Sequence, residues 1–150
     1  MDTIEIKVKR LHGHEDLALP SYETEGSSSV DIRAAVMGEI TLKPGEIKLI
    51  PTGLSVSIPK GYEGQIRPRS GLALHNGIGI INSPGTIDSD YRGEIGIILI
   101  NWGRNPFTIK RGDRIAQMAI SRIYQARIVE TDHLDTTQRG EGGFGHSGIG

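Results

Sequence analysis

Turn-forming residues recur at short, regular intervals along this chain and limit how long any strand or helix can be. They are Lys43-Pro-Gly45, Pro51-Thr-Gly53, Pro59-Lys-Gly61, Ser83-Pro-Gly85, Asn105-Pro106 and Arg111-Gly-Asp113. The segments between them have strand character: Ile4, Ile6 and Val8 alternate with charged residues, and Leu54–Ile58 alternates in the same way. The apolar, β-branched run Ile95–Ile100 predicts a strand that is buried on both faces. Many short strands separated by Gly and Pro predict an all-β sandwich or barrel, with at most one helical turn at Leu72–Asn76.

The C-terminal segment has a different composition from the rest of the chain. Six of the last twelve residues are glycine, and they are interspersed with Arg139, Phe144, His146 and Ser147. Such a segment loses much backbone entropy on ordering and buries little apolar surface, so it cannot fold alone. We therefore predict one domain over residues 1–136 and a flexible C-terminal lid of the same domain over residues 137–150.

Composition excludes several classes of function. The 17 basic and 18 acidic residues nearly balance, which argues against a protein that binds nucleic acid through its overall charge. The chain has no cysteine, so it forms no disulfide and no Cys-ligated zinc site. It has no apolar run long enough to span a bilayer and no signal-peptide core near its start. We expect a cytoplasmic protein with no nucleic-acid or membrane partner.

Two short motifs and one glutamine carry polar groups that could act in catalysis or ligand binding. Asp88-Ser-Asp90 is typical of a polar hairpin turn, and it is also compatible with a general base or a metal ligand. Arg67-Pro-Arg69-Ser70-Gly71 has guanidinium groups that bind phosphate bidentately, although a basic turn has the same composition. Gln117 lies among apolar neighbours and needs an amide partner, as a core group or as a ligand.

Taken in order, five motifs resemble those of the trimeric dUTPases of the bacterial all-β type, from about Pro20 to the end of the chain. They are residues 29–34 (SVDIRA), 68–72 (PRSGL), 85–93 (GTIDSDYRG), 111–117 (RGDRIAQ) and 139–148 (RGEGGFGHSG). One residue departs from the pattern, because Ser29 stands where the family usually has a glycine. The resemblance implies a distorted jelly roll or β-barrel of short strands and a homotrimer with shared active sites.

The resemblance also implies the reaction, which is hydrolysis of dUTP to dUMP and pyrophosphate. Asp88 would act as the general base on the water that attacks the α-phosphorus. Asp31 would hold, through water, a Mg²⁺ ion that the triphosphate chelates. The resemblance implies a dUTP diphosphatase, and the bacterial-type ending is compatible with a bacterium or with a phage in a bacterial host.

The resemblance also implies which residues bind the substrate, and they lie in or near motifs two to five. Phosphate contacts are implied for Arg69, Ser70, Gly71 and Gln117, and uracil and sugar contacts for Asn82, Gly85, Thr86, Ile87, Tyr91 and Gly96. The lid would contribute Arg139, Phe144, Gly145, His146 and Ser147, with Phe144 stacked over the uracil and the lid ordered only by substrate. We expect the base to be recognised by a hairpin that extends from Asn82 to Tyr91.

Two other functions fit parts of the same pattern. A dCTP deaminase shares the fold and several motifs, but the Arg-Gly-x-Gly-Gly-Phe-Gly ending argues against it. A non-catalytic module that senses dUTP and controls a partner protein would be expected to lack Asp88 or the lid, and both are present.

Overall fold

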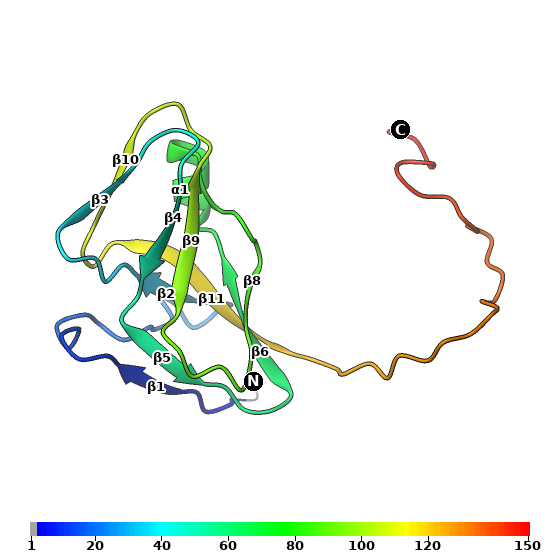
Figure 1. Cartoon of the computed structure of the whole chain (residues 1–150), viewed down its shortest axis with the longest axis horizontal. Coiled ribbons are helices and arrows are strands. Elements are labelled where there is room, and N and C mark those ends of the chain that lie inside the picture. Colours follow the sequence, from blue (N-terminus) through cyan, green and yellow to red (C-terminus); the bar gives the residue numbers. More distant parts are fainter. Residues whose placement is uncertain (1–2) are drawn as a thin grey trace.

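Short strands make up most of the folded part of this protein in a computed structural model that describes residues 3–150 (Figure 1). The strands are β1 (Lys7–Arg10), β2 (Val30–Arg33), β3 (Glu39–Leu42), β4 (Ile47–Pro51), β5 (Leu54–Ser57), β6 (Tyr62–Arg67), β7 (Ile78–Ile80), β8 (Gly85–Ile87), β9 (Gly96–Asn101), β10 (Phe107–Lys110) and β11 (Arg114–Arg122). One short helix, α1 (Ser70–Asn76), interrupts them in the described part. The prediction of an all-β fold is confirmed.

The described strands pair antiparallel in open sheets. The largest has the order β2-β11-β6-β8, a second has the order β4-β9-β7, and β1-β5 and β10-β3 form two-stranded pairs. Neighbours within a sheet are mostly far apart in sequence, so the chain crosses repeatedly between sheets. This arrangement matches a distorted jelly roll rather than a single closed barrel.

A core rich in isoleucine lies between the sheets. Strand β9 contributes Ile97 and Leu99, which are 1% and 0% exposed, and Ile95 just before it is also fully buried. Ile98 is only half-buried, so the predicted burial on both faces holds for most of this strand. Burying apolar side chains of this size stabilises the fold by roughly 1.5–3 kcal/mol each relative to exposure.

Two predicted elements differ in extent from the observed ones. The first strand begins at Lys7, so of the three alternating apolar residues only Val8 lies within it. The helix begins at Ser70, earlier than the single turn predicted from Leu72. It ends at Gly77, whose φ of 66° lies in the left-handed region, and a Cβ there would lie 2.5 Å from the backbone nitrogen of Gly103.

Beyond β11 the chain runs away from the sheets. Ile123 N still donates to Gly61 O at 2.9 Å. The following residues extend outward in Figure 1, where the orange-to-red segment lies apart from the strands. The division into residues 1–136 and 137–150 stays a prediction. No helix in residues 3–150 is long and apolar enough to cross a membrane.

Candidate functional site

Three of the sequence motifs meet on the sheet β2-β11-β6. Gln117 in β11 is in register with Asp31 on β2 and with Arg67 on β6. Paired residues on neighbouring strands lie about 4.5–5.5 Å apart, so these three positions form one row across the sheet. Residues 29–34, 68–72 and 111–117 are therefore brought together although they are distant in sequence.

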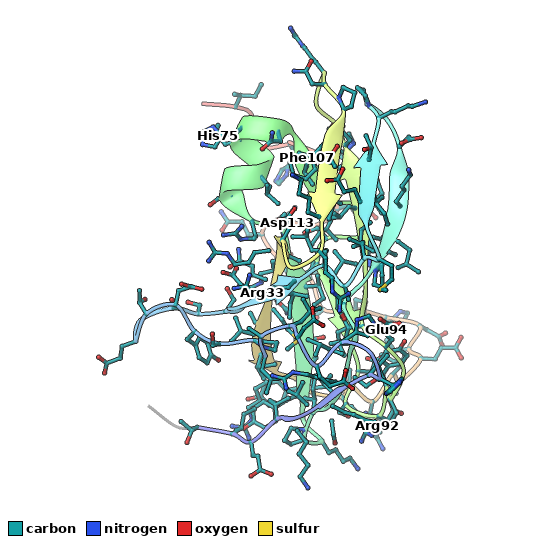
Figure 2. The ribbon with its side chains drawn as sticks, turned by 90° about the vertical axis from the view of Figure 1, so that its left-hand side faces the viewer. Arg33, His75, Arg92, Glu94, Phe107 and Asp113 are labelled. Atoms are coloured by element: carbon teal, nitrogen blue, oxygen red, sulfur yellow. The ribbon has the colours of Figure 1, made fainter. Side chains whose placement is uncertain are left out.

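The turn before β11 is fixed to the end of β2 by backbone hydrogen bonds. Gly112 N donates to Ala34 O, and Ala34 N donates to Asp113 O, each at 2.8 Å. Arg33 Nη1 also donates to Gly112 O at 2.9 Å. Figure 2 labels Arg33 and Asp113 on either side of this junction. The junction holds the strands that carry Asp31 and Gln117 in a defined register.

The side chain of Asp31 lies between two guanidinium groups. Its Oδ1 is 3.2 Å from Arg69 Nε, and its Oδ2 accepts from Arg114 Nη1 at 2.9 Å. The Asp31 side chain is only 16% exposed, and Arg69 also donates from Nη1 to Arg114 O at 3.1 Å. Arg114 makes a further ion pair of 3.1 Å with Glu23. Sequence reasoning missed Arg114 and Glu23 as members of this network, because their partners are more than 80 residues away in the chain.

The amide of Gln117 is satisfied at both ends. Its Nε2 donates to Pro68 O at 2.9 Å, and its Oε1 accepts from the hydroxyl of Ser29. The prediction that this amide needs polar partners is confirmed.

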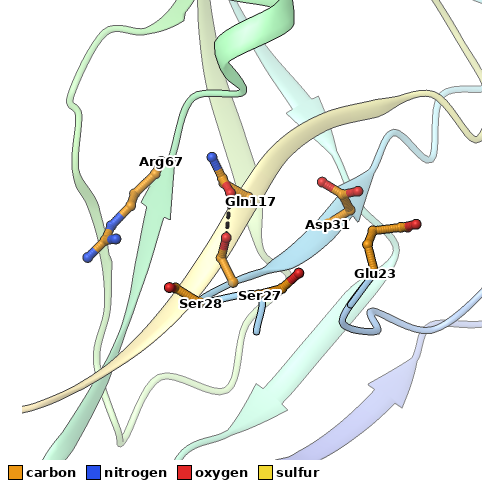
Figure 3. Close-up of a pocket in the computed structure, with 7 residues that line it drawn as sticks. Glu23, Ser27, Ser28, Asp31, Arg67 and Gln117 are labelled. Carbon is orange, nitrogen blue, oxygen red and sulfur yellow. Dashed lines mark hydrogen bonds between the residues drawn. The ribbon is translucent and has the colours of Figure 1, made fainter. Parts of the chain in front are cut away.

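A cavity of about 320 Å³ opens beside this row of residues. It is lined by Glu23, Ser27, Ser28, Ser29, Asp31, Arg67 and Gln117. Figure 3 shows Asp31 on β2, Arg67 on β6 and Gln117 on β11, with Glu23, Ser27 and Ser28 on the segment before β2 and the bond to Gln117 dashed. The lining is largely polar and combines hydroxyl, amide and guanidinium donors with carboxylates, which suits an anion that is accompanied by a cation.

Ser70 and Gly71 follow the cavity-lining residue Arg67 closely in the sequence and begin helix α1. Both are exposed, and the helix's first hydrogen bond runs from Ala73 N to Arg69 O at 3.0 Å. The N–H groups of Ser70 and Gly71 precede that bond and have no acceptor within the helix.

The segment with Asp88 lies on the far edge of the same sheet. Ile87 pairs with Gly64, which is three positions before Arg67 in β6, so Ile87 is displaced from the Arg67–Gln117 row by about 10 Å along the strands. Asp88 is exposed, and no hydrogen bond to its carboxylate occurs within residues 3–150. It does not line the cavity with Asp31 and Gln117.

The prediction of a hairpin from Asn82 to Tyr91 is wrong, because the strand in this segment pairs with a strand outside it. The strand in this segment, β8, pairs with β6, and within the described residues it has no partner strand inside the segment. A turn follows instead, closed by Tyr91 N donating to Asp88 O at 3.1 Å, and Tyr91 Oη donates to Glu94 O at 2.8 Å. Gly85 and Ile87 are buried, whereas Asn82 and Thr86 are exposed.

Gly96 lies at the start of β9 against another side chain. A Cβ at this position would lie 2.6 Å from Leu49 Cδ1. Leu49 is exposed and flexible and can move aside, so this contact alone does not require glycine, and the predicted closeness of Gly96 to a ligand stays a prediction.

The glycine-rich end makes only local hydrogen bonds. Arg139 Nε donates to Gly142 O at 2.7 Å, and His146 N donates to Gly143 O at 3.1 Å. The ring of Phe144 is fully exposed, and its φ of 51° lies in the left-handed region, which is uncommon for a residue with a side chain. The structure therefore does not bring Arg139, Phe144, Gly145, His146 or Ser147 to the cavity of the same chain.

Arg111, at the start of the fourth motif, anchors the N-terminal loop. It forms a bidentate pair with Asp16, with Nη2–Oδ1 at 2.7 Å and Nε–Oδ2 at 3.0 Å, and donates to Gly13 O at 3.1 Å. The hydrogen bond from Arg111 lowers the pKa of Asp16 below its ordinary value. This arginine is engaged in holding the fold rather than lining the cavity.

The donor set around Asp31 suits only certain metal ions. Within residues 3–150 no three His, Asp or Glu side chains are grouped to hold an ion by themselves. Asp31 Oδ2 accepts one hydrogen bond from Arg114 and Oδ1 faces Arg69 in an ion pair, so both oxygens retain lone pairs. These residues fit a hydrated Mg²⁺ that is coordinated mainly by water and by a bound phosphoanion.

Fold and site together define an all-β protein with a polar cleft at the junction of three strands. The dUTPase family model matches residues 15–148. This chain belongs to the dUTPase family.

Similar proteins extend over nearly the whole chain. The deoxyuridine 5'-triphosphate nucleotidohydrolase of Caldanaerobacter subterraneus subsp. tengcongensis is 53% identical over 147 residues, which cover 98% of this chain and 99% of the relative. That of Syntrophotalea carbinolica is 52% identical over 149 residues, with 99% and 100% covered. The solved dUTPase of Staphylococcus bacteriophage 80alpha with dUPNHPP is 27% identical, with a TM-score of 0.88 over 98% of this chain and 100% of that chain. The predicted family and the dUTPase-like fold are confirmed.

Proposed function

We propose that this chain hydrolyses dUTP to dUMP and pyrophosphate by attack of water on the α-phosphorus. The observation that carries the proposal is the convergence of Asp31, Arg67 and Gln117 around one polar cleft, with Arg69 paired to Asp31, in a chain of the dUTPase family. The relatives reported above are named for hydrolysis of this nucleotide.

The phosphate groups bind to residues of the second and fourth motifs in this proposal. Arg69 offers its guanidinium, which Asp31 orients through the 3.2 Å ion pair. Ser70 supplies its hydroxyl, Gly71 its N–H, and Gln117 an amide hydrogen. A guanidinium held by a carboxylate loses less freedom when the ligand arrives, which favours binding.

Asp88 is the general base in this proposal. Its exposed carboxylate is free of hydrogen bonds to other described residues, so it has lone pairs for an incoming water. Holding that water near the phosphorus turns a bimolecular attack into a local one, and partial removal of its proton raises its nucleophilicity.

We propose a homotrimer in which different copies complete each site. The position of Asp88 outside the cavity that Asp31 and Gln117 line supports this. Large apolar side chains are also exposed on β4 and beyond β11: Leu49 is 66% exposed, Tyr124 88% and Ile128 89%. Exposed large apolar side chains of this kind are available for an interface between chains.

The segment from Asn82 to Tyr91 selects the base and the sugar in this proposal. Backbone groups of Gly85, Thr86 and Ile87 pair with uracil, with the Asn82 side chain beside them and Gly96 close to the base. The ring of Tyr91, held by its hydrogen bond to Glu94 O, lies against the sugar and excludes a 2′-hydroxyl. A wall fixed by backbone bonds rejects larger ligands more strictly than a loose apolar pocket does.

The end of the chain closes over the substrate of another copy. Arg139 and His146, Ser147 and the N–H of Gly145 contact the terminal phosphates, and Phe144 stacks on the uracil. The outward path of this segment and its purely local hydrogen bonds support this role, since nothing in its own subunit holds it.

The family's divalent ion is Mg²⁺ in this proposal, held by Asp31 through water. When bound, it would neutralise charge on the leaving pyrophosphate. The bacterial relatives support action in the cytoplasm of a bacterium or of a phage-infected bacterial cell.

A product assay tests the proposal directly. The purified protein is incubated with Mg²⁺ and, separately, with dUTP, dCTP, dTTP or UTP, and the products are resolved by chromatography. Conversion of dUTP alone to dUMP and pyrophosphate is expected. Consumption of dCTP would instead indicate a deaminase, and binding of dUTP without turnover would indicate a sensing module.

A further inference from the structure

Ser29 departs from the family pattern, and the structure gives its side chain a specific contact. It lies just before β2, is half-buried and lines the cavity that also contains Asp31. Its hydroxyl donates to Oε1 of Gln117, which is 88 residues away in the sequence. Glycine at this position has no side chain and cannot make this bond.

The hydrogen bonds around Gln117 leave one orientation for its amide. Nε2 uses one N–H for Pro68 O, and Oε1 accepts from Ser29. If the amide were flipped, its oxygen would lie against the carbonyl oxygen of Pro68, and the two acceptors would repel each other. With two bonds made, the second N–H of Nε2 is left to donate to a ligand in the cavity.

We propose that Ser29 is a positioning residue that holds the Gln117 amide so that its remaining N–H is aimed at a phosphate oxygen of the substrate. The inference rests on the proposed function, because the phosphate is that of dUTP. A donor fixed before the substrate arrives needs no reorganisation as negative charge develops on the phosphate, so it stabilises the transition state more than the ground state.

The test is a double-mutant cycle that uses steady-state dUTP hydrolysis by the full-length protein. The variants are Ser29→Ala, Gln117→Ala and the combination, and alanine at position 29 removes the hydroxyl while it keeps the Cβ. Ser121→Ala is the matched control, because Ser121 is also half-buried and lies on the same strand as Gln117 but does not line the cavity.

We expect Ser29→Ala to lower kcat by about threefold to tenfold with KM changed less than twofold, as for the loss of one hydrogen bond that acts in the transition state. In the Gln117→Ala background the same change should alter kcat less than twofold, because the two residues act together. Ser121→Ala should resemble the wild type.

Three results would overturn the role of Ser29: an unchanged kcat in Ser29→Ala, a rise in KM alone, or an equal loss in the presence and absence of Gln117. Each of these results is a comparison with a wild-type protein that hydrolyses dUTP. A wild type that fails to hydrolyse dUTP would instead overturn the proposed function, so the two failures are distinct.

Discussion

Replacing Asp31 by asparagine removes the carboxylate that joins Arg69 and Arg114. Asparagine has nearly the same shape, so the change removes charge without creating a cavity. One amide oxygen can still accept from one guanidinium, but the NH₂ group then faces the other, where donor meets donor.

The size of the effect follows from one charge-assisted hydrogen bond to Arg114 and one ion pair with Arg69. A hydrogen bond to a charged group contributes about 1.5–3 kcal/mol, and a partly exposed ion pair contributes less. The arginine side chains are 29% and 37% exposed, so solvent screens both pairs, and asparagine keeps one acceptor. We therefore expect Asp31→Asn to lower the free energy of unfolding by about 2 kcal/mol, which lowers Tm by roughly 4–8 °C for a chain of this length.

Differential scanning calorimetry at pH 7 and fixed protein concentration measures this change. Glu39→Gln is the matched control, because Glu39 pairs with Lys110 at 3.8 Å where both side chains are more than half exposed. An exposed pair of that length contributes little, so a Tm close to the wild-type value is expected. Equal Tm values for Asp31→Asn and Glu39→Gln would refute the reasoning that the Asp31 network stabilises the fold.

Three further predictions concern catalysis, the lid and pH. Asp88→Asn should still bind dUTP in calorimetric titration but lose nearly all pyrophosphate release, whereas Asp90→Asn should keep most of it; comparable turnover in Asp88→Asn would remove Asp88 as the base. Deleting residues 139–150 should leave Tm and oligomeric state unchanged and reduce turnover to a very low level, and full activity in the shortened chain would contradict the lid. Because Arg111 lowers the pKa of Asp16, this pair stabilises the fold above the ordinary Asp pKa and the contribution is lost as pH falls through the lowered value. Thermal melts from pH 7 to pH 2 should therefore show a smaller loss of Tm for Asp16→Asn than for the wild type, and parallel curves would count against this linkage.

Local patterns in the sequence predicted much of the fold. Alternation at Leu54–Ile58 and the apolar run at Ile95–Ile100 both correspond to observed strands, because side-chain period and β-branching act within a few residues. The segment from Asn82 to Tyr91 was predicted incorrectly because its strand pairing is long-range. Turn residues there indicate that the chain reverses, but they do not indicate that β8 pairs with β6.

The amino-acid sequence specifies which residue types are available for the chemistry: a carboxylate at Asp31, a guanidinium at Arg69, an amide at Gln117 and a glycine-rich end. What each of these groups contacts follows from the folded arrangement of the strands. The partners of Asp31 and Gln117 lie across strands β2, β11 and β6, and no local periodicity encodes pairing between strands that are more than 40 residues apart. Register across a sheet is set by burial of one face and by long-range hydrogen bonds, so the contacts of Arg114 with Asp31 and of Ser29 with Gln117 exist only once the strands are paired.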